Sequence, residues 1–157
     1  MSRESKSELI QQVMDAVRAA QTASDLMDDA ACRALGINRT DARCMDIIDR
    51  EGPITAGRLA ERAALTTAGV TMVLDRLEKA GYARRVRDER DRRRVLVEMT
   101  PLARERAAEI WGPTEQFEGW LRRYSVEELR LLRDFNRGGA EWNEGRAAEV
   151  RARHPEN

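Results

Sequence analysis

The sequence predicts a mainly α-helical fold with one small β-hairpin. Its 157 residues match the usual size of one domain. Hydrophobic residues make up 41% of the chain but aromatic ones only 4%, and abundant Ala, Leu, Arg and Glu favour helices. Apolar residues recur at steps of three and four along most of the chain, and this spacing changes to short β-type runs after Gly81.

The N-terminal segment, about residues 5–35, predicts one long amphipathic helix. At 1.5 Å per residue it would be about 45 Å long, which exceeds what a small domain needs for its own core. A helix of this length usually packs on a partner, and Gly36 is suited to end it. Its apolar stripe consists of Ile10, Val13, Met14, Val17, Ala20, Met27, Ala31 and Leu35.

Three shorter helices follow within residues 37–81. Asn38 or Thr40 can cap the first of them, and Thr55 can cap a second that ends near Ala63. A turn at residues 65–66 begins the third, which Gly81 ends. Two helices joined by a short turn, the second starting with small residues, are typical of a helix-turn-helix. The buried face of the third helix carries Val70, Val73, Leu74 and Leu77, and the opposite face carries Ala68, Met72, Asp75 and Lys79.

A basic hairpin is expected next, with strands at 82–87 and 95–99 around the loop DERDRRR. Residues 82–94 hold seven arginines against three acids, a local excess of four positive charges, whereas the whole chain is neutral. The protein can therefore bind phosphate through this stripe without being basic overall. The predicted architecture is a winged helix-turn-helix lobe.

The C-terminal part is predicted to be helical again. Thr100-Pro101 begins a helix that Gly112-Pro113 should interrupt, and Ser125-x-x-Glu128 is a capping box for a last helix that should fray after residues 138–139. We therefore expect an N-terminal dimerisation helix, a DNA-binding lobe, and C-terminal dimerisation helices with a polar tail. These parts span residues 1–36, 37–99 and 100–157.

The stretch ITAGRLAERAALTTAGVTMVLDRLEKAGYARRVRDERDRRRVLVEMTPLARE resembles the MarR family of bacterial transcriptional regulators. Its most specific pieces are LDRLEKAGYARR, DERDRRR and VLVEMTPLA, and the upstream LGINRTDARCMDII agrees. The resemblance implies a homodimer with interleaved terminal helices and two lobes that bind a palindromic operator in double-stranded DNA. It also implies that a small apolar or aromatic effector could release the DNA. The long terminal helices independently indicate an apolar dimer seam, and two-fold symmetry predicts a two-fold operator.

Two groups of side chains are candidates for DNA contact. Small residues in the first turns of the predicted recognition helix can approach the major groove, although the threonines could instead only cap the helix. Wing-tip arginines can enter a minor groove, although an isolated charged loop would simply be solvated. Arg84, Arg85 and Arg87 on the incoming strand could face phosphate or solvent. Arg76 could contact phosphate or pair with a wing acid. The candidates are Thr66, Thr67, Ala68, Thr71, Arg76, Arg87, Arg90 and Arg92.

Asp75 lies on the face that would meet DNA, where a free carboxylate would repel phosphate. The family resemblance suggests that Arg93 neutralises it, so that the pair would lock the wing to the recognition helix. Trp111, Phe117 and Trp120 could line an effector pocket, or they could belong to the core or the dimer seam. Cys32 and Cys44 invite a peroxide-sensing interpretation, but Cys44 is expected to be a core residue.

The sequence argues against an enzyme. It has one histidine, His154, and neither a Gly-rich phosphate loop nor a nucleophile motif, so we expect no cofactor, no metal and no catalytic residue. The polar N-terminus has no signal-peptide pattern and no apolar run approaches about 18 residues, which predicts a cytoplasmic protein without membrane contact. We expect a dimeric DNA-binding regulator that acts as a repressor. The alternative is a winged-helix protein-interaction module without DNA binding.

Overall fold

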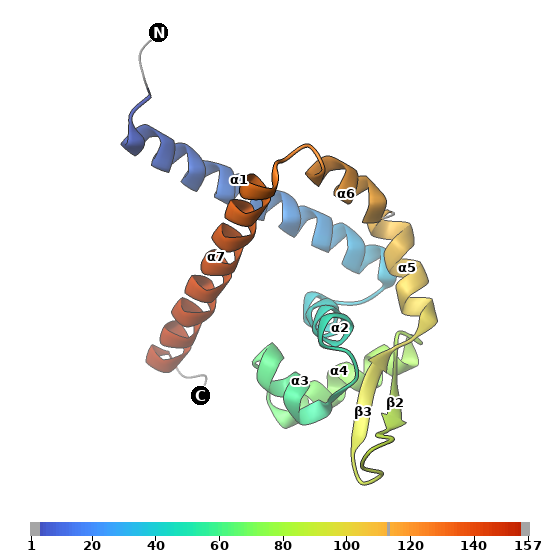
Figure 1. Ribbon diagram of the computed structural model, residues 1–157. Helices are drawn as coiled ribbons and strands as arrows, with labels where there is room; N and C mark the ends of the chain where they lie inside the picture. The colour runs from blue at the N-terminus through green and yellow to red at the C-terminus, as the bar shows by residue number, and fades with distance from the viewer. Residues whose placement is uncertain (1–3, 113, 155–157) are drawn as a thin grey trace. The chain divides into compact units, whose positions relative to one another are not determined.

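The computed structural model describes residues 4–112 and 114–154, apart from the side chain of Thr114. The chain forms two compact units, one up to Trp111 and the other from Gly112 onward, and each is described by itself. The first unit holds α1 to α5 and all three strands (Figure 1). The mainly helical fold class with a small β wing is therefore confirmed.

Helix α1, Lys6–Leu35, begins at a capping box in which Ser5 and Glu8 satisfy each other's backbone N–H groups. Gly36, with a φ of 67°, ends it in the left-handed conformation. Among the described residues of α1, the buried ones are Ala31, Cys32 and Leu35, all at its C-terminal end. Most of the helix therefore extends beyond the core of the first unit (Figure 1).

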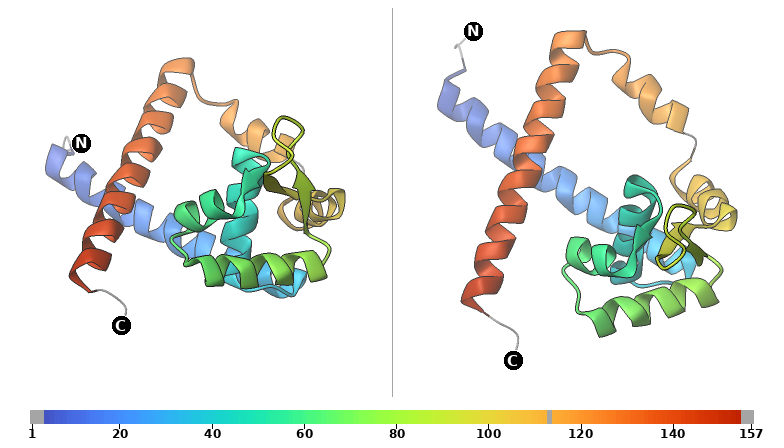
Figure 2. Two further views of the ribbon diagram at one scale, coloured as in Figure 1. Left: turned by 90° about the horizontal axis from the view of Figure 1, so that it is seen from below. Right: turned by 60° about the horizontal axis from the view of Figure 1, so that its bottom comes forward.

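Helices α2 (Arg39–Glu51), α3 (Ala56–Ala63) and α4 (Thr67–Lys79) pack around one core beside the sheet (Figure 2). The caps are Asn38, Thr55 and Thr66, which decides between the two candidates for α2. Burial follows the predicted apolar face of α4. The largest fully buried hydrophobic side chains are Ile48, Leu59, Leu74, Leu77, Val70, Val73 and Val97.

The sheet has three strands, one more than predicted. Strands β2 (Ala83–Arg87) and β3 (Val95–Met99) form the expected antiparallel hairpin. The additional strand β1, Ile54–Thr55, pairs with the other edge of β3, and Ile54 lies opposite Val97. A two-residue strand is too short to show the alternation of polar and apolar residues that identifies strands in a sequence.

Helix α5, Pro101–Trp111, is anchored by Thr100, whose hydroxyl donates to the carbonyl of Gly81 at 2.6 Å. It ends at Gly112, which has a φ of 74°, so the predicted interruption is confirmed there. Pro113, the other half of that prediction, lies outside the described residues.

The second unit consists of α6, Thr114–Leu121, and α7, Val126–Arg153. The predicted capping box of Ser125 and Glu128 begins α7. The expected fraying after residues 138–139 is wrong, because α7 continues through both glycines to Arg153. Each glycine costs about 1 kcal/mol relative to alanine, but strong helix formers follow and Arg146 pairs with Glu149 at 2.6 Å.

Within the described residues, no helix is both long and apolar enough to cross a membrane.

Candidate nucleic-acid interface

The turn between α3 and α4 sets the position of α4. Ala64 adopts the left-handed conformation, with a φ of 53°, at the C-terminal end of α3. Its N–H and that of Leu65 donate to carbonyls in the last turn of α3, at 3.2 and 2.8 Å. Alanine is uncommon in this conformation, so packing of the two helices must hold it there. The turn is thus short and fixed, as a helix-turn-helix requires.

The first turns of α4 present small side chains to the surface. Thr66, Thr67, Ala68 and Thr71 are all exposed. The hydroxyl of Thr66 accepts from the N–H of Gly69 at 3.0 Å, so it caps the helix. The hydroxyl of Thr71 donates to the carbonyl of Thr67 at 2.9 Å. Each of these two hydroxyls thus makes one hydrogen bond within the helix, and all four residues remain exposed.

Two aspartates shape the wing, which is the loop of residues 88–94 between β2 and β3. The carboxylate of Asp88 accepts from the N–H of Arg90 at 2.9 Å, and that of Asp91 accepts from the N–H of Arg93 at 3.1 Å. The N–H of Asp88 donates to the carbonyl of Arg94 at 3.0 Å, which closes the loop. Such side-chain acceptors stabilise tight turns. The acids therefore organise the wing besides lowering its charge.

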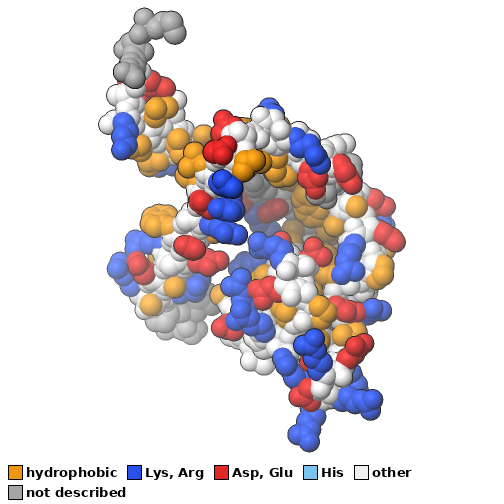
Figure 3. Space-filling model, viewed as in Figure 1, with side chains coloured by type: hydrophobic (Ala, Val, Ile, Leu, Met, Phe, Trp, Pro, Cys, Tyr) orange, Lys and Arg blue, Asp and Glu red, His pale blue; other side chains and the backbone are white. Residues whose placement is uncertain are grey.

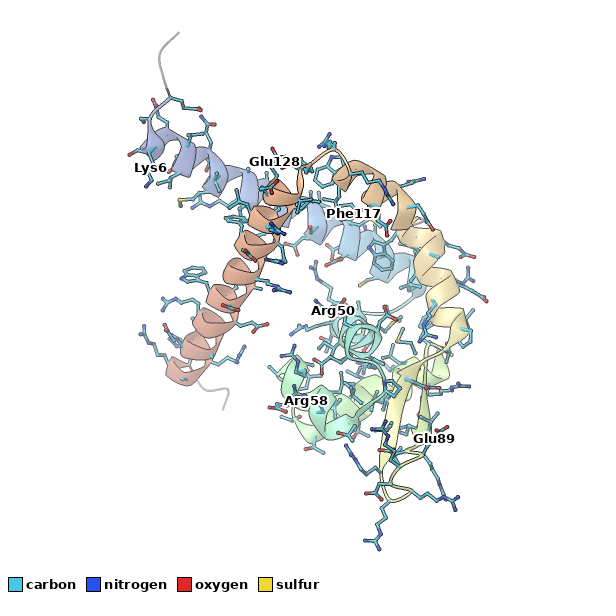
Figure 4. The ribbon with its side chains drawn as sticks, viewed as in Figure 1. Lys6, Arg50, Arg58, Glu89, Phe117 and Glu128 are labelled. Atoms are coloured by element: carbon cyan, nitrogen blue, oxygen red, sulfur yellow. The ribbon has the colours of Figure 1, made fainter. Side chains whose placement is uncertain are left out.

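The seven arginines of residues 82–94 fall into two classes. Arg84 pairs with Glu98 across the hairpin at 2.6 Å, Arg85 pairs with acids of α4, and Arg94 lies 3.8 Å from Asp88. The other four have no carboxylate within ion-pair distance among the described residues, and all are exposed. These four are Arg87, Arg90, Arg92 and Arg93. Figure 3 shows basic side chains gathered at the end of the hairpin, and in Figure 4 the side chains around Glu89 spread outward.

Asp75 has a different partner from the one predicted. Its carboxylate lies 3.0 Å from the guanidinium of Arg85, not beside Arg93. Arg85 also pairs with Glu78, and its backbone N–H donates to that carboxylate at 3.1 Å. The reason is the chain path: β2 follows α4 after a turn at Gly81, so Arg85 lies beside the last turns of α4, whereas Arg93 lies in the loop at the far end of the hairpin. The wing is braced to α4, but through β2.

Arg76 has a partner that the sequence did not suggest. Its guanidinium pairs with Asp41 on α2, with Nη2 at 2.6 Å from Oδ1 and Nε at 3.1 Å from Oδ2. The sequence had suggested phosphate or a wing acid instead. Asp41 lies 35 residues earlier, so no local pattern connected the two residues.

The effector and redox candidates have contrasting surroundings. Trp111 ends α5 in the first unit, whereas Phe117 and Trp120 lie on α6 in the second, and all three rings are exposed. The Phe117 and Trp120 ring centroids are 5.5 Å apart, and the guanidinium of Arg123 lies 4.8 Å from the Trp120 ring.

Both cysteines are buried and free. Burial raises the pKa of Cys32, and it raises the pKa of Cys44 to about 11. A peroxide-sensing thiol needs a lowered pKa and access, so the structure argues against that interpretation. Among the described residues, no group of three or more His, Cys, Asp or Glu side chains could hold a metal ion.

A surface hollow of about 480 Å³ between the start of α2 and α4 was not foreseen. It lies beside the exposed face of α4, where Met72 is 62% exposed. None of the three predicted effector-pocket residues lines it. The lining residues are Asn38, Arg39, Thr40, Leu65, Gly69, Met72, Val73 and Arg76.

Comparison with known proteins decides the family. The family whose sequence model matches is the MarR family, over residues 37–95. The HTH-type transcriptional regulator YcgE of Bacillus subtilis is 38% identical over 135 residues, which cover 85% of this chain and 88% of YcgE. The chain belongs to the MarR family. It is therefore a DNA-binding transcriptional regulator and not an enzyme.

Solved structures show the same fold. A MarR-family protein from Bacillus stearothermophilus aligns with a TM-score of 0.61 at 18% identity, covering 90% of this chain and 99% of that one. The transcriptional regulator Tm0710 from Thermotoga maritima aligns with a TM-score of 0.60 at 22% identity, covering 88% and 98%. The MarR fold thus extends over most of the chain, beyond the matched residues 37–95.

Proposed function

We propose that this MarR regulator acts as a homodimeric repressor that binds a palindromic operator through α4 and the wing. One observation carries the proposal. Of the seven arginines of residues 82–94, Arg87 at the end of β2 and Arg90, Arg92 and Arg93 in the wing are exposed without an acidic partner among the described residues, and β2 is braced to α4 through Arg85. Free guanidinium groups at this position favour phosphate and the minor groove. The alternative of an interaction module without DNA binding is not favoured, because the chain belongs to a family of DNA-binding regulators.

In this proposal, Thr66, Thr67, Ala68 and Thr71 face the major groove. Their methyl groups suit apolar contact with thymine, and the N-terminal end of α4 favours a nearby phosphate. Arg90 and Arg92 enter the minor groove, and Arg87 contacts phosphate from β2. Arg93 is a further candidate for DNA contact, because Asp75 pairs with Arg85 and not with Arg93.

The homodimer is supported by exposed apolar side chains on the long helices. On α1, Leu9, Ile10, Val13 and Met14 are each 45–52% exposed. Helix α7 likewise exposes large hydrophobic side chains, and monomers rarely leave apolar faces of this size uncovered. These side chains are Val126, Leu131, Leu132, Phe135, Trp142 and Val150. We assign residues 1–36 and 100–157 to the dimerisation region and 37–99 to the DNA-binding lobe, and a two-fold dimer predicts a two-fold operator.

We further propose that an aromatic effector lowers the affinity for DNA. The neighbouring exposed rings of Phe117 and Trp120, with Arg123 beside them, offer stacking surfaces and a positive charge. The structural neighbour NadR, 24% identical over 89% of this chain with a TM-score of 0.57, was solved in complex with 4-hydroxyphenylacetate. That compound is a reasonable first probe for this chain.

Footprinting on the intergenic DNA next to its own gene tests the proposal. We expect two protected half-sites about one helical turn apart, with protection reduced by 4-hydroxyphenylacetate or another aromatic acid. A reporter driven by that promoter should be more active when the regulator is deleted. Unprotected DNA would contradict the operator proposal, and lower reporter activity on deletion would contradict repression.

A further inference from the structure

We propose that Arg76 is a positioning residue, and that its pair with the buried Asp41 fixes the orientation of α4 required for operator binding. The proposal rests on the proposed contact between α4 and DNA. Arg76 then supports the DNA-contacting surface of α4 and does not itself contact DNA.

The buried partner carries the first step. Asp41 is 1% exposed, and among the described residues no other charged side chain is buried. Its carboxylate accepts two hydrogen bonds from Arg76, at 2.6 and 3.1 Å, and one from the backbone N–H of Asn38 at 3.5 Å. A two-point pair between planar groups fixes both distance and angle, which a single contact does not. The hydrogen bonds to Asp41 raise the pKa of Arg76, so the guanidinium stays charged.

The position of Arg76 on α4 gives the second step. Its side chain is 44% exposed, beside the face proposed to meet DNA, yet its Nε and Nη2 are directed at Asp41. One of the two edges through which a guanidinium can make a two-point contact, the edge of Nε and Nη2, is therefore occupied by Asp41. Arg76 lies near the C-terminal end of α4, and the turn at Ala64 holds the other end. The helix is thus fixed at both ends.

The turn that carries Asp41 is itself anchored to α1. Arg39, two residues earlier, pairs with Asp25 at 2.5 Å and with Asp29 at 2.8 Å. These pairs are exposed and individually weak, but together they restrain the first turn of α2. Asp41 is also the residue whose side chain closes the capping box of that turn with Asn38. The pair of Arg76 and Asp41 therefore ties α4 to a restrained part of the lobe.

Removing one partner alone should be worse than removing both. Arg76→Gln leaves a buried carboxylate without its counter-charge, and this is costly because the low dielectric around it strengthens every uncompensated charge. Asp41→Asn removes that charge, and in the double variant the two introduced amides can face each other. A phosphate-contacting Arg76 predicts the opposite, because Asp41→Asn could not restore a lost phosphate contact.

The test uses the full-length protein and a DNA duplex that the wild-type protein enriches from a randomised pool. Affinity is measured over a series of salt concentrations for Asp41→Asn, Arg76→Gln and the double variant, and thermal unfolding confirms that each is folded. Arg43→Gln is the matched control, since it removes one positive charge from an exposed position of α2 that is not among the residues proposed to contact DNA. Arg76→Lys is a milder variant that keeps the charge but cannot form the two-point pair.

We expect Arg76→Gln and Asp41→Asn each to weaken binding roughly 3- to 100-fold without changing the salt slope. The double variant should bind more tightly than Arg76→Gln, and Arg76→Lys should be intermediate. The proposal would be overturned if Arg76→Gln lowered the salt slope by the contribution of about one phosphate contact while Asp41→Asn bound like the wild-type protein. Wild-type affinity in Arg76→Lys would also overturn it. If the wild-type protein enriches no duplex, the proposed function fails and this proposal fails with it.

Discussion

The carboxylate of Asp75 on α4 lies 3.0 Å from the guanidinium of Arg85 on β2, and this contact joins α4 to the strand that leads into the wing. It predicts an energetic coupling that a double-mutant cycle can measure. Asp75→Ala should weaken operator binding although it removes a negative charge from the DNA-facing side. Because both groups are partly exposed, the coupling should be about 0.2–1 kcal/mol. A cycle between Asp75 and Arg93 is the control and should show none. Coupling to Arg93 but not to Arg85 would refute the assigned brace.

The wing acids give a second prediction that runs against simple charge counting. Asp91→Ala makes the wing more basic but removes the acceptor for the N–H of Arg93. We expect weaker operator binding by roughly 0.5–1.5 kcal/mol, because the loop loses a hydrogen bond that orders it. Asp91→Asn keeps an acceptor oxygen and is the control. Titration of the labelled operator measures both, and tighter binding by Asp91→Ala would show that net charge decides the affinity.

The dimer seam gives a third prediction. Ile10→Glu places a charge on the exposed apolar face of α1, where Ile10 is 52% exposed. We expect the sedimentation mass to fall to that of a monomer, since a buried unpaired charge at an interface is strongly unfavourable. Ala19→Glu lies on the opposite side of the same helix and should leave the mass unchanged. A monomeric wild-type protein would contradict the proposed homodimer directly.

The buried thiol of Cys44 predicts a pH dependence of stability. Burial raises its pKa from the usual 9.0 to about 11, so the folded state favours the neutral thiol. Its contribution to stability is complete below about pH 9 and is lost as the pH rises through about 11. The loss amounts to at most roughly 2–3 kcal/mol. Urea unfolding across this range should show a steeper decline for the wild-type protein than for Cys44→Ala. Equal slopes would mean that the thiol is not shielded in the folded protein.

The fold could be predicted because its signals are local. The change from helical spacing to β-type runs at Gly81 located the wing, and the face with Val70, Val73 and Leu77 is buried as expected. The local signals missed one element that is very short and one helical stretch whose glycines have low helix propensity. Strand β1 has two residues, and α7 continues through Gly138 and Gly139, whose low helix propensity had predicted an end there.

The partners of charged residues were harder to predict, because they depend on how elements pack. Nothing in the sequence distinguishes Arg85 from Arg93 as the partner of Asp75 until the path of β2 along α4 is known. A signal for Asp41 did exist. It lies on the same face of α2 as Met45 and Ile48, and an acid among core positions indicates a buried counter-charge. The pattern could not show that this counter-charge is Arg76.

In the proposed interface, the unpaired arginines of the hairpin contact DNA and the paired ones do not. The most direct measurement compares the salt dependence of operator binding for Arg90→Ala and Arg84→Ala. Each variant removes one positive charge from the hairpin, but Arg84 is already paired with Glu98 at 2.6 Å. Arg90→Ala should weaken binding by about 1–3 kcal/mol and lower the salt slope by about one, whereas Arg84→Ala should change both far less. An unchanged slope in Arg90→Ala, or equal effects of the two variants, would contradict the account.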